Sequence, residues 1–126
     1  MHHVFQIPTA FLDMQASGAT MEYEQMVAPP PDSMRSSAAI AEFGQSVRTR
    51  FADWWESAKD ESFDGQVPTY FGGTSRHEML ERVVWHSTQH VRQVASLLER
   101  AGVEPSQPLT SQDIEGLPLT DKIWDE

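Results

Sequence analysis

The chain contains no cysteine among its 126 residues. Disulfide bonds, a nucleophilic thiol and thiolate coordination are therefore excluded, so any metal ion must be bound by histidine and carboxylate side chains. Basic residues are also scarce: 9 Lys and Arg stand against 19 Asp and Glu, which gives a net charge of -10. Because phosphate backbones and anionic membranes attract positive surfaces, nucleic acid and membranes are not expected partners.

Long apolar runs are missing as well. No apolar stretch approaches the roughly 20 residues that span a bilayer. The N-terminal residues MHHVFQIPTAFLDM lack the basic region and the uninterrupted apolar region of a signal peptide, so we expect a cytoplasmic protein. The length of 126 residues and a hydrophobic content of 39% predict a single soluble domain over residues 1–126 with one modest core.

Three segments have the apolar spacing of long helices. The first covers roughly residues 2–16, where Pro8 predicts a helix that is bent or starts late. The second runs from about Ser36 to Ala58, with Ser36 or Ser37 as its N-cap. Its apolar face, which is expected to pack in the core, carries Ile40, Phe43, Val47, Phe51, Trp54 and Trp55.

The third long helix has the clearest boundaries. Ser75 followed by Glu78 fits a capping box at its start, and Gly102 after Ala101 fits a left-handed stop at its end. Its apolar stripe consists of Leu80, Val83, Val84, Val91, Val94, Leu98 and Ala101. A core that joins the second and third helices is expected to contain Phe43, Val47, Phe51, Trp55, Leu80, Val84, Val91 and Leu98.

The remaining segments contain most of the proline and glycine. Residues 17–33 include three consecutive prolines and are predicted to form a connector with one helical turn around 21–27. Residues 59–74 are broken by Gly and Pro, and QVPTYF within them favours a short extended segment or a loop. The tail after Gly102 is expected to be extended, with a helical turn at 111–115 and Trp124 packing back on the domain.

Two histidines, His86 and His90, lie on the same flank of the apolar stripe of the third helix. At this spacing their Cβ atoms are about 5–6 Å apart, close enough for both rings to bind one ion. The alternative is a pair of boundary histidines that hydrogen-bond locally. A zinc peptidase is not supported, because Ser87 stands where the H-E-x-x-H pattern has its glutamate. His77, on the opposite flank, is expected at the surface.

The chain resembles the DinB-like superfamily in segments along essentially its whole length. These segments are HVFQIPTAFLD at residues 3–13, ADWW at 52–55, LERVVWHSTQHVRQVASLLERAGV at 80–103, and GLPL…W from Gly116 to Trp124. The superfamily consists of metal-binding four-helix bundles and includes bacillithiol- and mycothiol-dependent transferases. Within it, the chain is similar to a subgroup found alone or joined to a glutaredoxin-like domain. The resemblance implies an all-α fold.

The family typically binds its metal with three histidines, one on an early helix and two in an H-x-x-x-H pattern on a later one. The resemblance therefore implies His3, His86 and His90 as metal ligands, with His2 as the alternative to His3 if the register slips. Such a site leaves coordination positions where water or a substrate thiol becomes more acidic. Because sites built from histidine alone suit zinc, nickel, copper and iron alike, the expected cofactor is a divalent ion such as zinc, nickel or iron, used together with a low-molecular-weight thiol.

The family also has a full helix before the histidine that matches His3, and this chain begins at that histidine. The expected fold is therefore an N-terminally shortened DinB-like helical bundle, with three main helices and an extended C-terminal tail. Three helices leave apolar surface without a partner. Either the natural protein has upstream residues or a second copy covers the gap, and a homodimer is expected.

Two functions are consistent with the resemblance. The first is a metal-dependent thiol transferase or hydrolase that acts on a small-molecule substrate at the three histidines. The second is a non-catalytic metal-binding or interaction module that works beside a glutaredoxin-like redox partner. Catalytic residues are not assigned. The candidates for groups that support the metal ligands are Tyr70, Gln89, Arg92 and Gln93.

Overall fold

The computed structural model describes residues 2–124, which form two compact units. The first unit ends at Val83 and the second begins at Val84, so the boundary falls within one long helix. The elements of the first unit are η1 (His2–Phe5), α1 (Gln6–Ser17), α2 (Tyr23–Val27), η2 (Asp32–Met34), α3 (Ser37–Ala58), β1 (Gln66–Thr69), β2 (Gly72–Ser75) and the start of α4 (Arg76–Arg100). The second unit contains the rest of α4 and α5 (Ser111–Ile114).

The ends of the long helices lie where the sequence predicts them. Pro8 falls in the first turn of α1, where the proline ring is tolerated, and a 3₁₀ turn precedes the helix. Ser36 caps α3 by accepting a hydrogen bond from the Ala39 N–H at 3.1 Å. At the far end of α4, Gly102 has a φ of 72°, which confirms the predicted left-handed stop.

The capping box at the start of α4 is also confirmed. The Ser75 hydroxyl accepts from the Glu78 N–H at 3.1 Å, and the Glu78 carboxylate accepts from the Ser75 N–H at 2.9 Å. The backbone N–H of Ser75, followed by its hydroxyl and that of Thr74, holds the pKa of Glu78 below its usual value. The charged carboxylate therefore helps to hold the first turn of α4.

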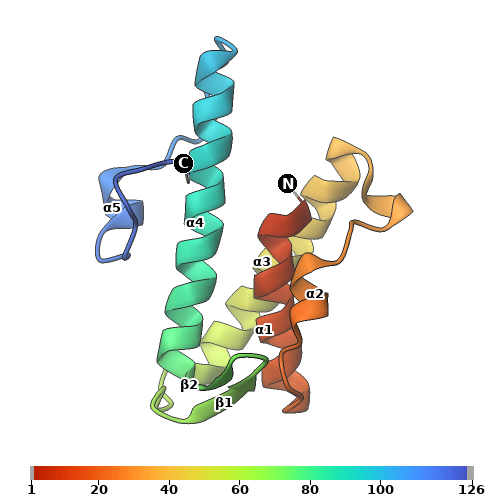
Figure 1. The fold of residues 1–126 in the computed structure, drawn as a ribbon, viewed down its shortest axis with the longest axis vertical. Coiled ribbons are helices and arrows are strands. Elements are labelled where there is room, and N and C mark those ends of the chain that lie inside the picture. Colours follow the sequence, from red (N-terminus) through yellow and green to blue (C-terminus); the bar gives the residue numbers. More distant parts are fainter. Residues whose placement is uncertain (1, 125–126) are drawn as a thin grey trace. The chain divides into compact units, whose positions relative to one another are not determined.

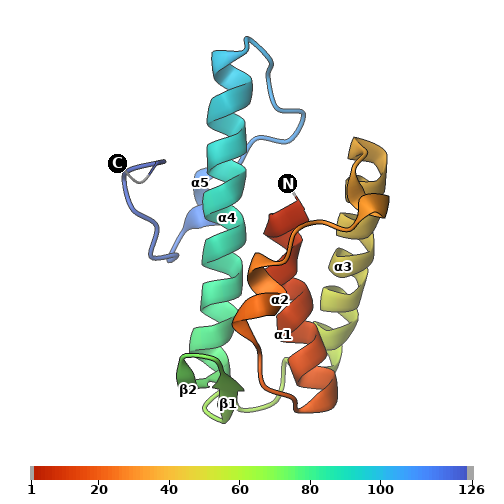
Figure 2. The ribbon, with the colours of Figure 1, turned by 45° about the vertical axis from the view of Figure 1, so that its right-hand side comes forward.

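Within the first unit, α1 packs against both α2 and α3 (Figures 1 and 2). The ring of Phe11 is fully buried and makes an edge contact with Trp54 at a centroid distance of 4.9 Å. The predicted α3 face is partly confirmed, because Val47 is buried and both Phe43 and Phe51 pack against the core. The buried core cluster consists of Ile7, Ala10, Phe11, Leu12, Met14, Met21, Met26, Val47, Val67, Met79 and Val83.

For two residues, Trp55 and Val84, the prediction that they lie in the core is wrong. Trp55 is 42% exposed, because its neighbour Trp54 occupies the inward position against Phe11. Val84 is 40% exposed, although Leu80, one turn earlier on α4, packs against the core of the first unit. Adjacent residues on a helix differ by about 100° in direction, so only one of the two tryptophans can point inward.

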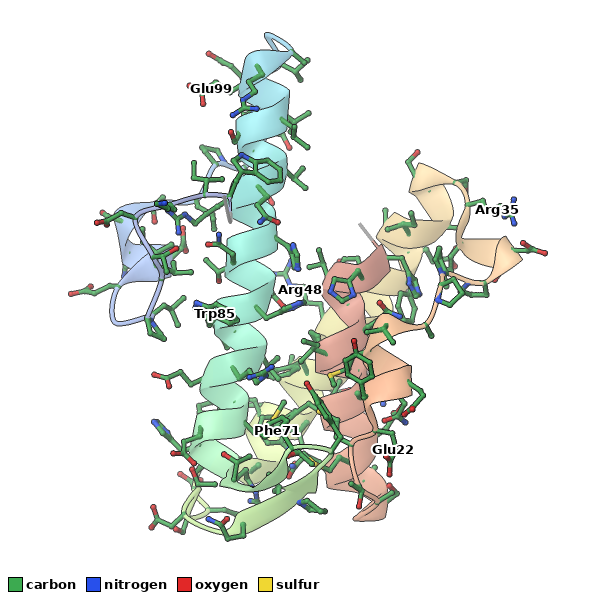
Figure 3. The ribbon with its side chains drawn as sticks, in the orientation of Figure 1. Glu22, Arg35, Arg48, Phe71, Trp85 and Glu99 are labelled. Atoms are coloured by element: carbon green, nitrogen blue, oxygen red, sulfur yellow. The ribbon has the colours of Figure 1, made fainter. Side chains whose placement is uncertain are left out.

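The segment after α3 forms an antiparallel hairpin. The strands pair from Gln66 with Ser75 to Thr69 with Gly72. Tyr70 and Phe71 make the turn, and Phe71 is labelled in Figure 3. The extended segment expected in QVPTYF is therefore confirmed, whereas its partner strand, Gly72–Ser75, carries no strand signal in its sequence. The chain is thus mostly helical, as the all-α class requires, with a small two-stranded sheet added.

Among the described residues of the second unit, no apolar side chain is fully buried. Between Val84 and the last described residue, Trp124, Thr88 is the buried side chain, and the predicted core residues Val91 and Leu98 are half-buried. Polar side chains of α4 donate hydrogen bonds to backbone carbonyls of the tail, and the blue ribbon of Figure 1 shows the tail turning back beside the helix. The turn expected at 111–115 is confirmed as α5. Across residues 2–124, no helix is both long enough and apolar enough to cross a bilayer.

Candidate metal centre

His86 and His90 face each other on adjacent turns of α4, inside the second unit. Their Nε2 atoms are 3.1 Å apart, and their rings meet edge to face with centroids 4.4 Å apart. Both side chains are half-buried. Two nitrogens that bind one zinc ion at about 2.0–2.1 Å each, with an angle of about 90–110° at the metal, lie about 2.9–3.4 Å apart. The two rings therefore make the local hydrogen bond of the alternative interpretation, and their separation also equals the spacing of two ligands of one ion.

Gln93 contacts the second ring nitrogen of His90, Nδ1. The His90 Nδ1 lies 2.7 Å from the Gln93 Oε1, and the Gln93 Nε2 donates to the backbone carbonyl of Ile123 at 3.2 Å. Metal-binding histidines usually donate their second ring N–H to an oxygen acceptor of this kind, which fixes the direction of the ring. Gln93, one of the candidate supporting groups, thus contacts a predicted ligand in this unit.

His3 lies in the first unit, on the 3₁₀ turn η1, and is exposed. The His3 Nδ1 lies 2.8 Å from the Oε1 of Gln6, and the Gln6 Nε2 donates to the carbonyl of Ala28 at 2.6 Å. Gln6 was not among the expected supporting residues. The signal that could have found it is the repeated His-x-x-Gln spacing, which occurs at residues 3–6, 86–89 and 90–93, once after each predicted ligand.

His2 has a different environment from His3. Its ring stacks on Phe43 with centroids 5.6 Å apart and an interplanar angle of 19°, and its Nδ1 is shielded from solvent. Next to it, Phe5 lies so close to α3 that a Cβ at Gly44 would be 2.5 Å from the ring. These contacts fix the 3₁₀ turn on α3 through His2 and Phe5.

The other candidate supporting groups have structural partners. Gln89 donates to the Ile123 carbonyl at 2.9 Å, and Arg92 donates to the Thr120 carbonyl at 2.8 Å. Tyr70, in the first unit, packs its ring against Tyr23 and Phe71. Gln89 and Arg92 therefore bind the tail, and Tyr70 belongs to an aromatic contact at the hairpin turn. His77 is exposed, as expected.

A cavity of about 580 Å³ lies within the second unit, between the last turns of α4 and the tail. Its lining includes Arg92, Glu99, Val103, Leu109 and Ile123, and Glu99 is labelled in Figure 3. Ile123 therefore lines this cavity and also accepts hydrogen bonds from Gln89 and Gln93 through its carbonyl.

Comparison with the models of known protein families, with curated protein sequences and with solved structures finds no match to this chain.

Proposed function

We propose that the chain binds one divalent metal ion through His86, His90 and His3, as a DinB-like protein acting on a small molecule. The observation that carries this proposal is the pair of Nε2 atoms 3.1 Å apart on α4. Two imidazoles at this separation, one of them braced through Nδ1 by an amide oxygen, form a typical half of a histidine metal site. The choice of His3 as the third ligand and of the DinB-like superfamily as the family is based on the sequence resemblance.

His3 is preferred to His2 as the third ligand because of its local contacts. Gln6 braces the Nδ1 of His3 as Gln93 braces the Nδ1 of His90, so in both rings Nε2 is the nitrogen that would bind the ion. His2, in contrast, is stacked on Phe43. A ring used for stacking and shielded at Nδ1 has less freedom to turn toward an ion.

The donor set suits zinc, nickel, copper or iron. Three imidazoles leave at least one coordination position, where a bound ion would make water or a thiol more acidic. With a low-molecular-weight thiol as co-substrate, the reaction would transfer a group to sulfur or hydrolyse a small molecule. The histidines hold the ion, and their glutamine partners keep the ring directions fixed.

Metal content after loading with zinc and removal of excess tests the ligand set. The wild type should retain about one ion per chain, and the His86→Ala/His90→Ala double variant should retain none, because three-ligand sites do not survive loss of two ligands. His77→Ala, on the same helix with an exposed side chain, is the matched control and should retain the wild-type amount. Equal zinc content in the wild type and the double variant would place the site elsewhere.

The third ligand is tested by His3→Ala and His2→Ala. We expect weaker zinc binding in His3→Ala and unchanged binding in His2→Ala. The reverse result would move the third ligand to His2. Activity is tested by incubating the zinc-loaded protein with a panel of low-molecular-weight thiols and a chromogenic aryl halide. In that reaction the thiolate sulfur bonds to the aryl carbon, halide leaves, and the thiol proton passes to water. A metal-loaded protein without any such activity would favour the non-catalytic module.

A further inference from the structure

The tail of the second unit is connected to His90 through a chain of hydrogen bonds. The chain begins at the Ile123 carbonyl, which accepts from the Gln93 Nε2 at 3.2 Å. It continues from the Gln93 Oε1 to the His90 Nδ1 at 2.7 Å. It ends at the His90 Nε2, which faces the His86 Nε2. Each atom in this chain constrains the role of the next.

A backbone carbonyl can only accept a hydrogen bond, so the end of the Gln93 amide nearest Ile123 must be the NH₂ group. The other end is then the oxygen, which also can only accept. The His90 Nδ1 must therefore carry a hydrogen and donate it. In a neutral ring this leaves the lone pair on Nε2, the atom that faces His86.

We propose that Gln93 is a positioning residue that fixes the neutral His90 ring in its Nδ1–H tautomer, with the tail carbonyl of Ile123 setting the direction of the Gln93 amide. The inference rests on the proposed function, because the Nδ1–H tautomer is useful for metal binding. It leaves on Nε2 the lone pair that a metal ion requires. The tail thereby becomes part of the metal site without contacting the ion.

The same arrangement occurs independently in the first unit. The Gln6 Nε2 donates to the Ala28 carbonyl at 2.6 Å, and the Gln6 Oε1 faces the His3 Nδ1 at 2.8 Å. Gln6 is buried, and its Nε2 also donates to the Gln25 carbonyl at 3.5 Å. Two predicted ligands on different elements, His3 and His90, thus contact the side-chain oxygen of a glutamine three residues later, and each of these glutamines is anchored to a carbonyl of a distant segment.

The tautomer can be measured without any metal. Long-range ¹H–¹⁵N correlation spectra of the metal-free, ¹⁵N-labelled protein, recorded where the rings are neutral, distinguish the protonated ring nitrogen from the one with the lone pair. The wild type should show His90 as the Nδ1–H form. Gln93→Leu, which removes the acceptor, should change His90 to a mixture of tautomers or to the Nε2–H form. The zinc affinity of Gln93→Leu should fall by about 10- to 100-fold, as for other groups that orient ligands.

Two further variants separate positioning from folding. Gln89→Leu removes a bond to the same Ile123 carbonyl without touching His90, so it should leave the tautomer as in the wild type. Gln93→Glu keeps an acceptor toward Nδ1, so it should restore the Nδ1–H form and part of the zinc affinity lost in Gln93→Leu. If Gln93→Leu acted through a general loss of structure, Gln89→Leu would change the tautomer as well, and Gln93→Glu would restore neither the tautomer nor the zinc affinity.

The two proposals fail in different ways. If Gln93→Leu keeps the Nδ1–H form and the wild-type zinc affinity, Gln93 has no positioning role, whether or not the protein binds zinc. If the tautomers change as expected but the wild type takes up no zinc, the proposed metal site is wrong and the role of Gln93 in orienting His90 still stands.

Discussion

Among the described residues, the buried apolar side chains all lie in the first unit, whereas the apolar side chains of the second unit are at most half-buried. Every hydrophobic core residue lies between Val4 and Val83, with Phe11, Met21 and Met79 almost completely covered. From Val84 to the last described residue, amide and guanidinium groups of α4 donate to backbone carbonyls of the tail, beside apolar side chains that are half-buried. Burial of apolar surface stabilises without regard to direction, while hydrogen bonds impose direction.

This difference suits the two regions to different tasks. A unit with a continuous core resists changes in shape, because its interior is closely packed. A unit held by hydrogen bonds fixes the direction of particular groups, and the ring of His90 is one of them. His90, a predicted metal ligand of the second unit, is thus oriented by a polar contact with Gln93.

The largest effect should come from removing a core side chain of the first unit. Phe11→Ala should lower the free energy of unfolding by about 3–5 kcal/mol, since the ring is fully buried against Phe51 and Trp54. Leu98→Ala, at a half-buried position of the second unit, should lower it by only about 1–2 kcal/mol. Urea denaturation followed by tryptophan fluorescence measures both. Equal losses would remove the contrast between the units.

The homodimer expected from the sequence stays a prediction, and the second unit is the place to test it. Leu97 on α4 is 51% exposed. We expect light scattering on the wild type to give twice the chain mass of 14.2 kDa. Leu97→Glu should weaken association by about tenfold or more, because a charge would enter an apolar contact. Val27→Glu, at an equally exposed position of the first unit, is the control. A wild-type mass of 14.2 kDa contradicts the dimer.

Release of the tail should be a smaller and local effect. Arg92→Ala removes the bond to the Thr120 carbonyl, and we expect the free energy of local tail opening to fall by about 1–3 kcal/mol. Trypsin should then cut after Lys122 about tenfold faster or more, with little change in the urea midpoint. Arg100→Ala, an exposed position on the same helix, should leave this rate unchanged. An equal rise in both variants would show that Arg92 does not hold the tail.

The smallest effect concerns two carboxylates, one in each unit, whose pKa values are lowered by capping. The main cause is the backbone N–H of Ser75 for Glu78, and the hydroxyl of Thr110 for Asp113. Both carboxylates stabilise the fold above their unfolded pKa, and this contribution is lost as the pH falls through the folded pKa. Ser75→Ala should raise the pKa of Glu78 only partly, because the N–H remains.

Thr110→Val removes the main cause for Asp113 and should bring its pKa closer to the ordinary value. NMR titration of the carboxyl carbons measures both changes. A larger recovery for Glu78 than for Asp113 would show that the two caps work differently from the way their hydrogen bonds indicate.

The helices and their caps could be predicted because each depends on residues close in sequence. Ser36, the Ser75–Glu78 pair and Gly102 act within one turn of their helix ends, and apolar spacing shows the faces. The choice between Trp54 and Trp55 could not be predicted, since both fit the same stripe. The strand Gly72–Ser75 was missed because its pairing with β1, and not its composition, makes it extended.

Of the candidate site, the pairing of His86 with His90 follows from helix geometry and was predictable. Gln93 was named among several candidates, but its selection depends on the Ile123 carbonyl, which lies 30 residues away in the sequence. Gln6 was missed for the same reason, because its amide is anchored by Ala28, 22 residues later. Helical spacing predicts which side chains share a face. The acceptor of a polar side chain, in contrast, depends on where a segment distant in the sequence lies in the fold.

The close approach of Phe5 to Gly44 limits how this sequence can vary during evolution. Glycine inside a helix is less favourable than alanine by roughly 0.5–1 kcal/mol, so alanine should replace it wherever space allows. Here the first added carbon would lie 2.5 Å from the ring. In relatives, alanine at position 44 should therefore occur together with a smaller side chain at position 5, so that the two positions covary. Because Phe5 closes the turn that carries His3, such paired changes would preserve the placement of that histidine while its surroundings diverge.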